Sequence, residues 1–307
     1  MSGLRKAYGD VEAVRGVSFE VDRGEVFCLL GPNGAGKTTT VEILEGYRLR
    51  SGGDVRVLGR DPAAGERELR EAVGIVLQQC GVQRDLTVRE LVEMYGRYHA
   101  RKRPVDEVIA LVELTEKRDV RANDLSGGQR RRLDLALALV GDPDLIFLDE
   151  PTTGFDPAAR RQAWSTIKSL CELGKTIFLT THFMDEAQAL ADRVAVMRDG
   201  EIIASGRPDE LGGRDLRPAE IRFVLPPQWS LGDLPNVPSV GREVQADRVT
   251  VFTREPVIAA HEITTWALYH DVELGHFSVT QPTLEDIYLE LTGSGGAHET
   301  TAEEVVR

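Results

Sequence analysis

Short, continuous apolar runs recur through the first two thirds of the chain, at residues 25–30, 144–149 and 176–181. Such runs are typical of strands that are buried on both faces of a parallel sheet. Between them, apolar residues recur at helical spacing, which predicts helices. These segments are 86–102, 105–114, 127–140 and 157–174, the last closing on Gly174. Strands that alternate with helices indicate an α/β fold.

Other short segments add strands to this prediction. Residues 17–21 alternate between apolar and polar, 54–60 form a second short run, and 72–79 read as a buried strand. Residues 193–206 predict a hairpin, because Asp199-Gly200 is a dipeptide that favours a tight two-residue turn.

The pattern changes after about residue 213. The next stretch, to about 240, is rich in Pro and turn residues, as linkers and surface loops are. Beyond it the pattern predicts a small α+β domain over 214–293, and the last residues, 294–307, read as a disordered tail. The elements expected in that domain are a strand at 247–253, a helix at 257–270, a strand at 272–280 and a helix at 282–293.

Composition narrows the class of protein. With 307 residues, 41% apolar and 28% charged, the chain has material for one large α/β domain and a smaller one. A net charge of −13 argues against binding along a nucleic-acid backbone, which requires a basic surface. No signal peptide or membrane-length apolar run is present, so we expect another chain to supply any membrane part. Cys28, Cys80 and Cys171 lack metal-ligand spacing and read as buried, reduced thiols.

A phosphate-binding loop follows the first apolar run. Residues 31–38, GPNGAGKT, fit the motif G-x-x-x-x-G-K-[ST] between a predicted strand and a predicted helix. Gly34 and Gly36 allow the loop to wrap around phosphate with its N–H groups pointing inward. We expect Lys37 to reach the β- and γ-phosphates and the Thr38 hydroxyl to bind Mg²⁺.

An acidic pair ends the apolar run at 144–149. Asp149 stands where a carboxylate can hold Mg²⁺ through water, and Glu150 comes next, placed to orient or deprotonate an attacking water. An Asp-Glu pair alone is an ordinary strand end. Together with the phosphate loop it predicts hydrolysis of a nucleoside triphosphate.

A second candidate anion site lies at residues 123–132, NDLSGGQRRR. Ser126 and two glycines precede a helix, an arrangement that offers backbone N–H groups to an anion. Arg130–Arg132 then read either as an extra phosphate clamp or as a solvated helix face, and we favour the solvated face.

With these motifs in place, the sequence resembles the ATP-binding cassette (ABC) ATPases, from about Leu4 to Gly213. The strongest mark is the signature LSGGQ at 125–129, between the phosphate loop and the acidic pair. Four further positions match family motifs: Gln78 of the Q-loop, Asp156 of the D-loop, the switch residue His182, and Tyr8, the aromatic that stacks on adenine.

This resemblance implies a fold and a set of site residues. The fold is a P-loop ABC cassette over 1–213, with a RecA-like core, an antiparallel β subdomain and a helical subdomain at about 80–140. The implied cofactors are ATP and Mg²⁺. The implied catalytic residues are Glu150, His182, Gln78 and Lys37, and the implied metal ligands are Thr38, Gln78 and Asp149. The implied nucleotide contacts are Tyr8, Gly31, Pro32, Asn33, Gly34, Ala35, Gly36, Lys37, Thr38, Thr39, Gln78, Ser126, Gly127, Gly128, Gln129 and Asp156.

The resemblance also implies a dimer. In this family the signature helix closes over the γ-phosphate held by a second subunit, so two ATP molecules lie between head-to-tail monomers. Hydrolysis then removes the contacts to Ser126 and Gly128 and lets the dimer reopen.

Finer resemblance indicates what the dimer drives. The segments LTVRE, EPTTGFDP, THFMDEAQALADRV and PTLEDIYLELTG are similar to ATPases of the daunorubicin-type drug-resistance exporters. This implies a separate polytopic permease, a location at the cytoplasmic face of the cell membrane, and efflux of drugs or other hydrophobic or amphipathic cargo. A soluble ABC ATPase of cofactor assembly, without a permease, stays open as the alternative.

The start of the chain departs from the family pattern. Only three residues precede Leu4, where the family usually has a short strand before this segment. Either the chain starts further upstream or the first antiparallel strand is absent.

Overall fold

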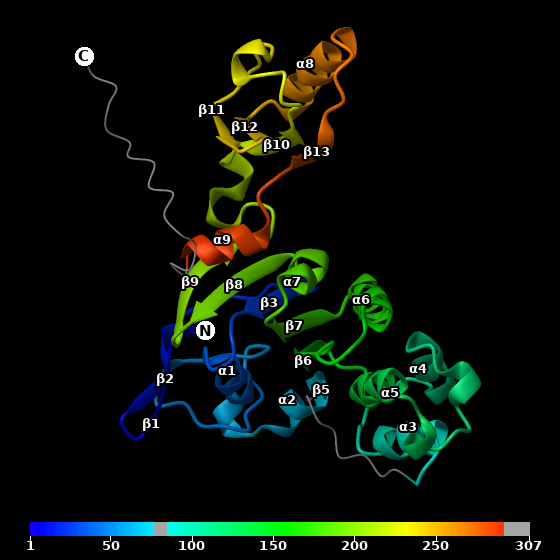
Figure 1. Cartoon of the computed structure of the whole chain (residues 1–307). Helices are drawn as coiled ribbons and strands as arrows, with labels where there is room; N and C mark the ends of the chain where they lie inside the picture. Colours follow the sequence, from blue (N-terminus) through cyan, green and yellow to red (C-terminus); the bar gives the residue numbers. More distant parts are fainter. Residues whose placement is uncertain (77–84, 292–307) are drawn as a thin grey trace. The chain divides into compact units, whose positions relative to one another are not determined.

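The computed structural model describes residues 1–76 and 85–291. The chain divides into two compact units, one ending at Pro208 and one beginning at Asp209, and each is described by itself (Figure 1). In the described ranges, no helix is long and apolar enough to cross a membrane.

A six-stranded sheet forms the centre of the first unit. Its order is β5-β6-β7-β3-β8-β9, with every neighbouring pair parallel except β8 and β9. All residues of β3 and β7 are buried, as their continuous apolar runs predict. The strands are β3 (Val26–Leu30), β5 (Val73–Val76), β6 (Leu145–Asp149), β7 (Thr176–Thr181), β8 (Arg193–Arg198) and β9 (Glu201–Gly206).

Four helices accompany this sheet. The helix α1 contacts β6, and α7 contacts β3 and β7. The predicted crossover helix is confirmed as α6, which ends just before Gly174, a residue with φ of 77°. The hairpin of β8 and β9 is also confirmed, with positive φ at Asp199 and Gly200. The helices are α1 (Lys37–Leu44), α2 (Arg67–Ala72), α6 (Pro157–Glu172) and α7 (Met184–Leu190).

The antiparallel sheet of the first unit has the order β2-β1-β4, with β1 (Ser2–Tyr8), β2 (Val11–Val17) and β4 (Gly52–Asp54). The first antiparallel strand is therefore present, formed by the LRKAYG segment itself. A strand at 17–21 is not observed. The backbone of Phe19 still exchanges hydrogen bonds with Met1, its N–H donating to the Met1 carbonyl at 3.2 Å and its carbonyl accepting from the Met1 amino group at 2.7 Å, while its ring stacks on Phe27 with centroids 4.8 Å apart.

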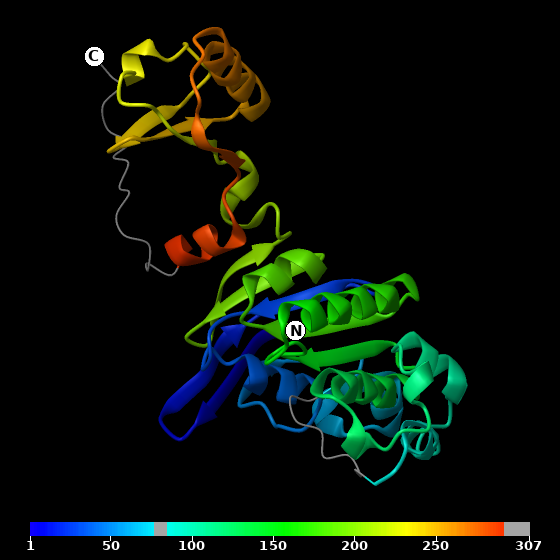
Figure 2. The same cartoon turned by 45° about the vertical axis from the view of Figure 1, so that its right-hand side comes forward.

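Three helices group beside β5 in the region predicted to be helical, α3 (Val88–Gly96), α4 (Val105–Leu111) and α5 (Gly127–Leu139) (Figures 1 and 2). The helix α3 contacts both α4 and α5, and α5 contacts β5. The predicted helix at 86–102 is shorter than expected, since α3 ends at Gly96. Short 3₁₀ segments connect the elements of the chain: Pro62–Ala64, Thr115–Lys117, Ala122–Asp124, Leu211–Leu216 (broken at Gly212 and Gly213) and Leu231–Asp233.

The second unit is built on a four-stranded antiparallel sheet with the order β11-β12-β10-β13. Its core includes Ile221, Phe223, Val249, Val251 and Ile263. Its elements are β10 (Ala219–Val224), β11 (Gly241–Gln245), β12 (Arg248–Thr253), β13 (Gly275–Thr280), α8 (Pro256–Tyr269) and α9 (Leu284–Leu291).

The strand β10 lies where the Pro-rich composition predicts linkers and loops, and β11 begins directly after that stretch, where no strand was predicted. The strand β10 is even central, because it pairs with both β12 and β13. Its residues Ala219, Ile221 and Phe223 alternate into the core, but prolines at 218 and 226 enclose the run and mask it.

Candidate functional site

The phosphate loop joins the carboxyl end of β3 to the start of α1. At Gly36 the backbone has φ of 102°, and a Cβ there would lie 2.5 Å from the carbonyl oxygen of Ala13. Only glycine fits such a position without displacing the neighbouring backbone. The loop at 31–38 therefore has the backbone conformation that its glycines predict.

Lys37 is buried at the base of this loop, with a side chain 5% exposed. Its Nζ donates to the carbonyl oxygens of Gly31 at 2.7 Å and Pro32 at 3.1 Å, and it lies 3.6 Å from Oε1 of Glu150. Burial lowers the pKa of Lys37, while the neighbouring carboxylates Glu150 and Asp149 act in the opposite direction. A buried ammonium held by carbonyls is well suited to receive an anion.

The acidic pair lies at the end of β6, beside β7 in the sheet. The register pairs Asp149 with Thr180, whose hydroxyl donates to Oδ1 of Asp149 at 2.5 Å. Oxygen donors such as the Asp149 carboxylate and the exposed Thr38 hydroxyl are the kind that Mg²⁺ prefers.

Glu150 has an unusual backbone and a crowded carboxylate. Its φ is 46°, and its N–H donates to both the carbonyl and the hydroxyl oxygen of Thr180, each at 3.1 Å. Its Oε2 accepts from Thr153 Oγ1 at 3.1 Å, and its Oε1 lies 3.3 Å from Nδ1 of His182. The loops after β3, β6 and β7 thus bring Lys37, Glu150 and His182 together.

His182 follows β7 and packs its ring against Phe183, with centroids 4.1 Å apart. Its Nδ1 is buried and makes no hydrogen bond in the described part of the chain, although Oε1 of Glu150 lies within ion-pair distance. The two groups are close without hydrogen-bond geometry, so this ring nitrogen keeps its bonding capacity for another group.

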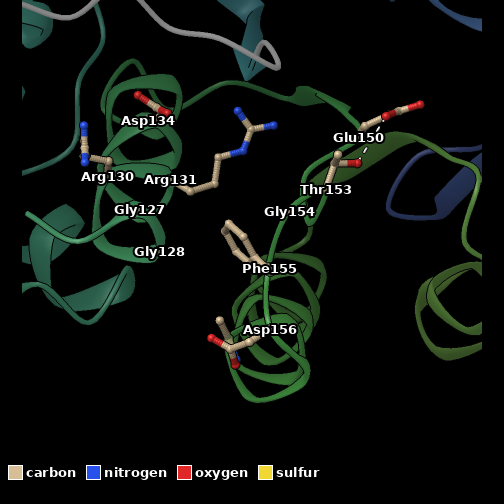
Figure 3. Close-up of a pocket in the computed structure, with 11 residues that line it drawn as sticks. Gly127, Gly128, Arg130, Arg131, Asp134, Glu150, Thr153, Gly154, Phe155 and Asp156 are labelled. Atoms are coloured by element: carbon tan, nitrogen blue, oxygen red, sulfur yellow. Dashed lines mark hydrogen bonds between the residues drawn. The ribbon is translucent and has the colours of Figure 1, made fainter.

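The signature segment opens α5 with a capping box. Ser126 Oγ accepts from the N–H of Gln129 at 3.3 Å, and the Gln129 side chain accepts from the Ser126 N–H at 3.0 Å. A pocket of about 360 Å³ lies beside this helix start (Figure 3). Its lining includes Gly127, Gly128, Glu150 and Asp156, and none of the described residues of the phosphate loop.

The three arginines after the signature do not form a solvated face, so that expectation is wrong. Arg131 is half-buried and donates to the carbonyl oxygens of Asp149 at 3.1 Å and Pro151 at 3.2 Å. Arg132 is 18% exposed and reaches Glu113 on the preceding segment. Both side chains are held because the helix packs against the core rather than standing in water.

Tyr8 is exposed on β1, as a stacking platform requires. Two cations lie near its ring, with Lys6 Nζ 5.0 Å and Arg48 Cζ 5.2 Å from the centroid. Asp156 has a structural task at the start of α6. Its carboxylate accepts from the N–H groups of Ala158 and Ala159, and these bonds lower its pKa.

One predicted site residue, Gln78, lies outside the described residues, and so does Cys80. Of the other two cysteines, Cys28 is buried and Cys171 half-buried, and both are free thiols. Sequence reasoning missed Thr180, Thr153 and Arg131. Thr180 has a signal, since parallel strands with matched ends bring it beside Asp149, whereas nothing in the sequence distinguishes Arg131 from its neighbours.

Comparison with known families agrees with this geometry. A family model described as "ABC transporter" matches residues 14–153. A second model, "ABC transporter domain-containing protein-like, C-terminal domain", matches residues 219–283.

Full-length relatives extend the match to nearly the whole chain. A protein of Rhizobium sp. (strain N33) named "Nod factor export ATP-binding protein I" is 39% identical over 300 residues, covering 95% of this chain and 96% of the relative. The protein of the same name from Ralstonia nicotianae is 37% identical over 301 residues, covering 95% and 93%.

Solved structures of ATP-binding cassettes resemble about two thirds of the chain. An ATP-binding cassette of an ABC transporter, MJ1267 in its ADP conformation, has a TM-score of 0.60 at 26% identity, covering 68% of this chain and 90% of that one. The cassette MJ0796, a dimer bound to ADP and Pi in a post-hydrolysis state, has a TM-score of 0.60 at 27% identity, covering 67% and 97%. The chain therefore belongs to the ATP-binding cassette family of ABC transporters, and it binds ATP with Mg²⁺ and hydrolyses it to ADP and phosphate in an activity coupled to transport.

Proposed function

We propose that this chain is the ATPase subunit of a bacterial exporter and drives a separate, polytopic membrane permease. The observation that carries the proposal is the end-to-end match to export ATP-binding proteins, which spans 95% of the chain and includes the C-terminal segment. A stand-alone cassette would be expected to match over the first unit only.

In the proposed reaction Glu150 is the general base. It takes a proton from water, whose oxygen attacks the γ-phosphorus while the bond to the bridging oxygen of ADP breaks. Lys37 holds the γ-phosphate, and His182 contacts it through the ring nitrogen beside Glu150. The distances of 3.6 Å and 3.3 Å from Glu150 Oε1 to these two groups support one shared centre.

Thr38 and Asp149 would hold the metal ion, together with Gln78. When bound, Mg²⁺ neutralises charge on the phosphates. The remaining contacts in this proposal are the adenine platform Tyr8 and the loop residues 31–39, which enclose the phosphates with backbone N–H groups.

We assign Ser126–Gln129 to the ATP of a second copy of the chain, with Asp156 facing the same interface. The pocket beside the signature is consistent with this, because its lining joins Gly127 and Gly128 to Asp156 and includes none of residues 31–38, although it reaches Glu150 of the chain's own site. Two ATP molecules then lie between head-to-tail monomers, consistent with the dimeric state of the similar cassette MJ0796.

The cargo in this proposal is a drug or another hydrophobic or amphipathic molecule. Two of the relatives are named for Nod factor export. The resemblance of the sequence motifs to those of daunorubicin-type exporters also favours this class of cargo. The subunit would work at the cytoplasmic face of the membrane through its permease. We assign residues 1–213 to the nucleotide-binding domain and 214–293 to an accessory domain that contributes to dimerisation or regulation.

Affinity capture tests the permease. Tagged Glu150→Gln protein, in ATP and Mg²⁺, is recovered from detergent-solubilised membranes of its host and analysed by mass spectrometry. We expect a polytopic membrane protein in roughly equal amount to the bait. A tagged Lys37→Ala protein, which lacks the phosphate contact, shows which partners depend on the ATP-bound state. Recovery of soluble partners alone would overturn the exporter assignment and favour a cofactor-assembly ATPase.

A further inference from the structure

Two parts of the helix α5 contact different groups. Its first residues hold the signature, and one turn later Arg131 extends toward the end of β6 (Figure 3). The guanidinium donates from Nη2 to the carbonyl oxygen of Asp149 at 3.1 Å and from Nε to that of Pro151 at 3.2 Å. These two residues stand immediately before and after Glu150.

The segment that Arg131 contacts, residues 149–151, has a strained backbone that needs support from other residues. Glu150 has a φ of 46°, a left-handed conformation that non-glycine residues adopt only when the surroundings impose it. A turn of this kind directs neighbouring carbonyl groups away from the strand ladder, and each needs another donor when it is half-buried. Arg131 supplies both donors with one rigid, planar group.

The other hydrogen bonds that hold Glu150 come from β7 and from its own loop. Its N–H is fixed by Thr180, and its carboxylate accepts from Thr153. Arg131 is therefore the support that α5 contributes to the backbone of this residue. Any shift of α5 is transmitted to the peptide groups on both sides of Glu150 through a side chain with little freedom.

We propose that Arg131 is a positioning residue, through which contact of the signature with one ATP sets the geometry of the base at the other. This rests on the proposed function, in which Ser126–Gln129 bind the ATP of the second copy while Glu150 serves the chain's own ATP. Within one chain, Arg131 joins the two sites by two hydrogen bonds. Hydrolysis at one site then depends on occupation of the other.

The chain offers a matched control in Arg132. This neighbour lies on the same helix with an 18% exposed side chain, but its guanidinium bonds to Glu113 rather than to the Glu150 segment. Substitution of either arginine by Met removes the same charge from α5. Only substitution of Arg131 releases the carbonyls beside Glu150.

Steady-state hydrolysis by the purified full-length chain tests the proposal, in Arg131→Lys, Arg131→Met, Arg132→Lys and Arg132→Met. For Arg131→Met we expect kcat to fall at least about tenfold, the ATP concentration at half-saturation to stay within about twofold, and the Hill coefficient for ATP to fall toward one. Arg131→Lys keeps the charge but cannot bridge two carbonyls, so it is expected to lie between wild type and Arg131→Met. Both Arg132 variants are expected to keep kcat and the Hill coefficient within about twofold.

Two results would overturn the proposal. One is an Arg131→Met protein whose kcat and Hill coefficient match those of Arg132→Met. The other is a loss of ATP binding in proportion to the loss of turnover in both Arg131 variants, which would mean that Arg131 only supports folding. The Glu150→Gln variant distinguishes failure of this proposal from failure of the proposed function. ATP hydrolysis by Glu150→Gln would show that Glu150 is not the general base, independently of the results for the Arg131 variants.

Discussion

At the scale of single residues, Glu150 is both the proposed general base and a residue with a strained, left-handed backbone. A non-glycine residue in the left-handed region costs about 1–3 kcal/mol, and the fold holds it there with Thr180 and Arg131 on either side. Strain of this kind fixes a carboxylate in one direction. It aims the Glu150 side chain at the space between Lys37 and His182.

The substitution Glu150→Gln is expected to remove turnover and keep ATP binding. The amide retains the shape of the carboxylate but cannot accept a proton from water, so kcat should fall by at least about 10²-fold. Light scattering in ATP and Mg²⁺ should then detect a stable dimer. The exposed Glu116→Gln is the control and should hydrolyse ATP as wild type does; a monomeric Glu150→Gln protein in ATP would contradict the two-ATP dimer.

Glu45 predicts a pH dependence of stability. Both carboxylate oxygens are buried and have no hydrogen-bond partner among the residues that the structure describes, and burial, with Asp149 and Glu42 nearby, raises the pKa of Glu45 to about 8. The folded state therefore binds a proton that the unfolded chain releases near its ordinary pKa of 4.5, so this group makes stability fall as pH rises from there to about 8. The other charged or titratable residues lining the pocket it faces are Tyr47, Arg70, Tyr95, His99 and Asp134.

Glu45→Gln tests this, because it imitates the protonated acid at every pH. At about pH 9, scanning calorimetry should give Glu45→Gln a Tm several degrees above that of wild type, since each kcal/mol of stability corresponds to about 2–4 °C. This difference in Tm should shrink steadily as the pH is lowered toward about 5. A gap that does not change with pH would show that Glu45 is already paired or already solvated. The exposed Glu116→Gln should show no gap at either end.

At the scale of elements, α3 and α5 begin with the same capping motif, but only the motif of α5 has a further role in the proposed function. Thr87 with Glu90 caps α3, and Ser126 with Gln129 caps α5, each with reciprocal side-chain and backbone bonds. A lost cap of this type destabilises a helix by about 1 kcal/mol. The Ser126 hydroxyl has a second task in the proposed dimer, and the Thr87 hydroxyl does not.

Thr87→Ala and Ser126→Ala are therefore expected to lower the free energy of unfolding by similar amounts, about 1 kcal/mol each. Only Ser126→Ala should also weaken ATP-induced dimerisation, measured by light scattering in an otherwise Glu150→Gln chain. Equal dimerisation in both variants would remove Ser126 from the phosphate contact and leave it as a cap.

These elements also show how far the sequence determines the site. The runs that form β3, β6 and β7 were predictable because strands buried on both faces need uninterrupted apolar residues, and the glycines of the phosphate loop reveal its backbone. The strand β10 was not, since prolines enclose it on both sides. Arg131 was not predictable either, because its role comes from the packing of α5 against β6, and a helix sequence does not record what its polar side chains meet.

At the scale of the molecule, each unit has its own sheet and its own core. The sheet of β10–β13 closes on Phe223, Val251 and Ile263, and a distinct family model matches it. The first unit holds the described residues of the nucleotide site from Tyr8 to His182. The contacts described for that site all join residues of the first unit.

A chain ending at Pro208 is therefore expected to fold and to bind ATP within about threefold of the affinity of the full-length protein, which corresponds to less than about 1 kcal/mol. Equilibrium binding of a fluorescent ATP analogue, with Lys37→Ala as the non-binding control, measures this. An insoluble product, or a large loss of affinity, would mean that the first unit depends on the second for its stability.

The order of strands in the central sheet has a consequence for synthesis. The strand β3, which carries the phosphate loop, is flanked by β7 and β8, and both are made from residues 176–198. While the ribosome is adding the residues between, the loop has emerged but its strand has no neighbour, and pairings between distant segments form late. The nascent chain should therefore be unable to hold nucleotide until β8 has left the exit tunnel, so that ATP binding reports the completion of the cassette.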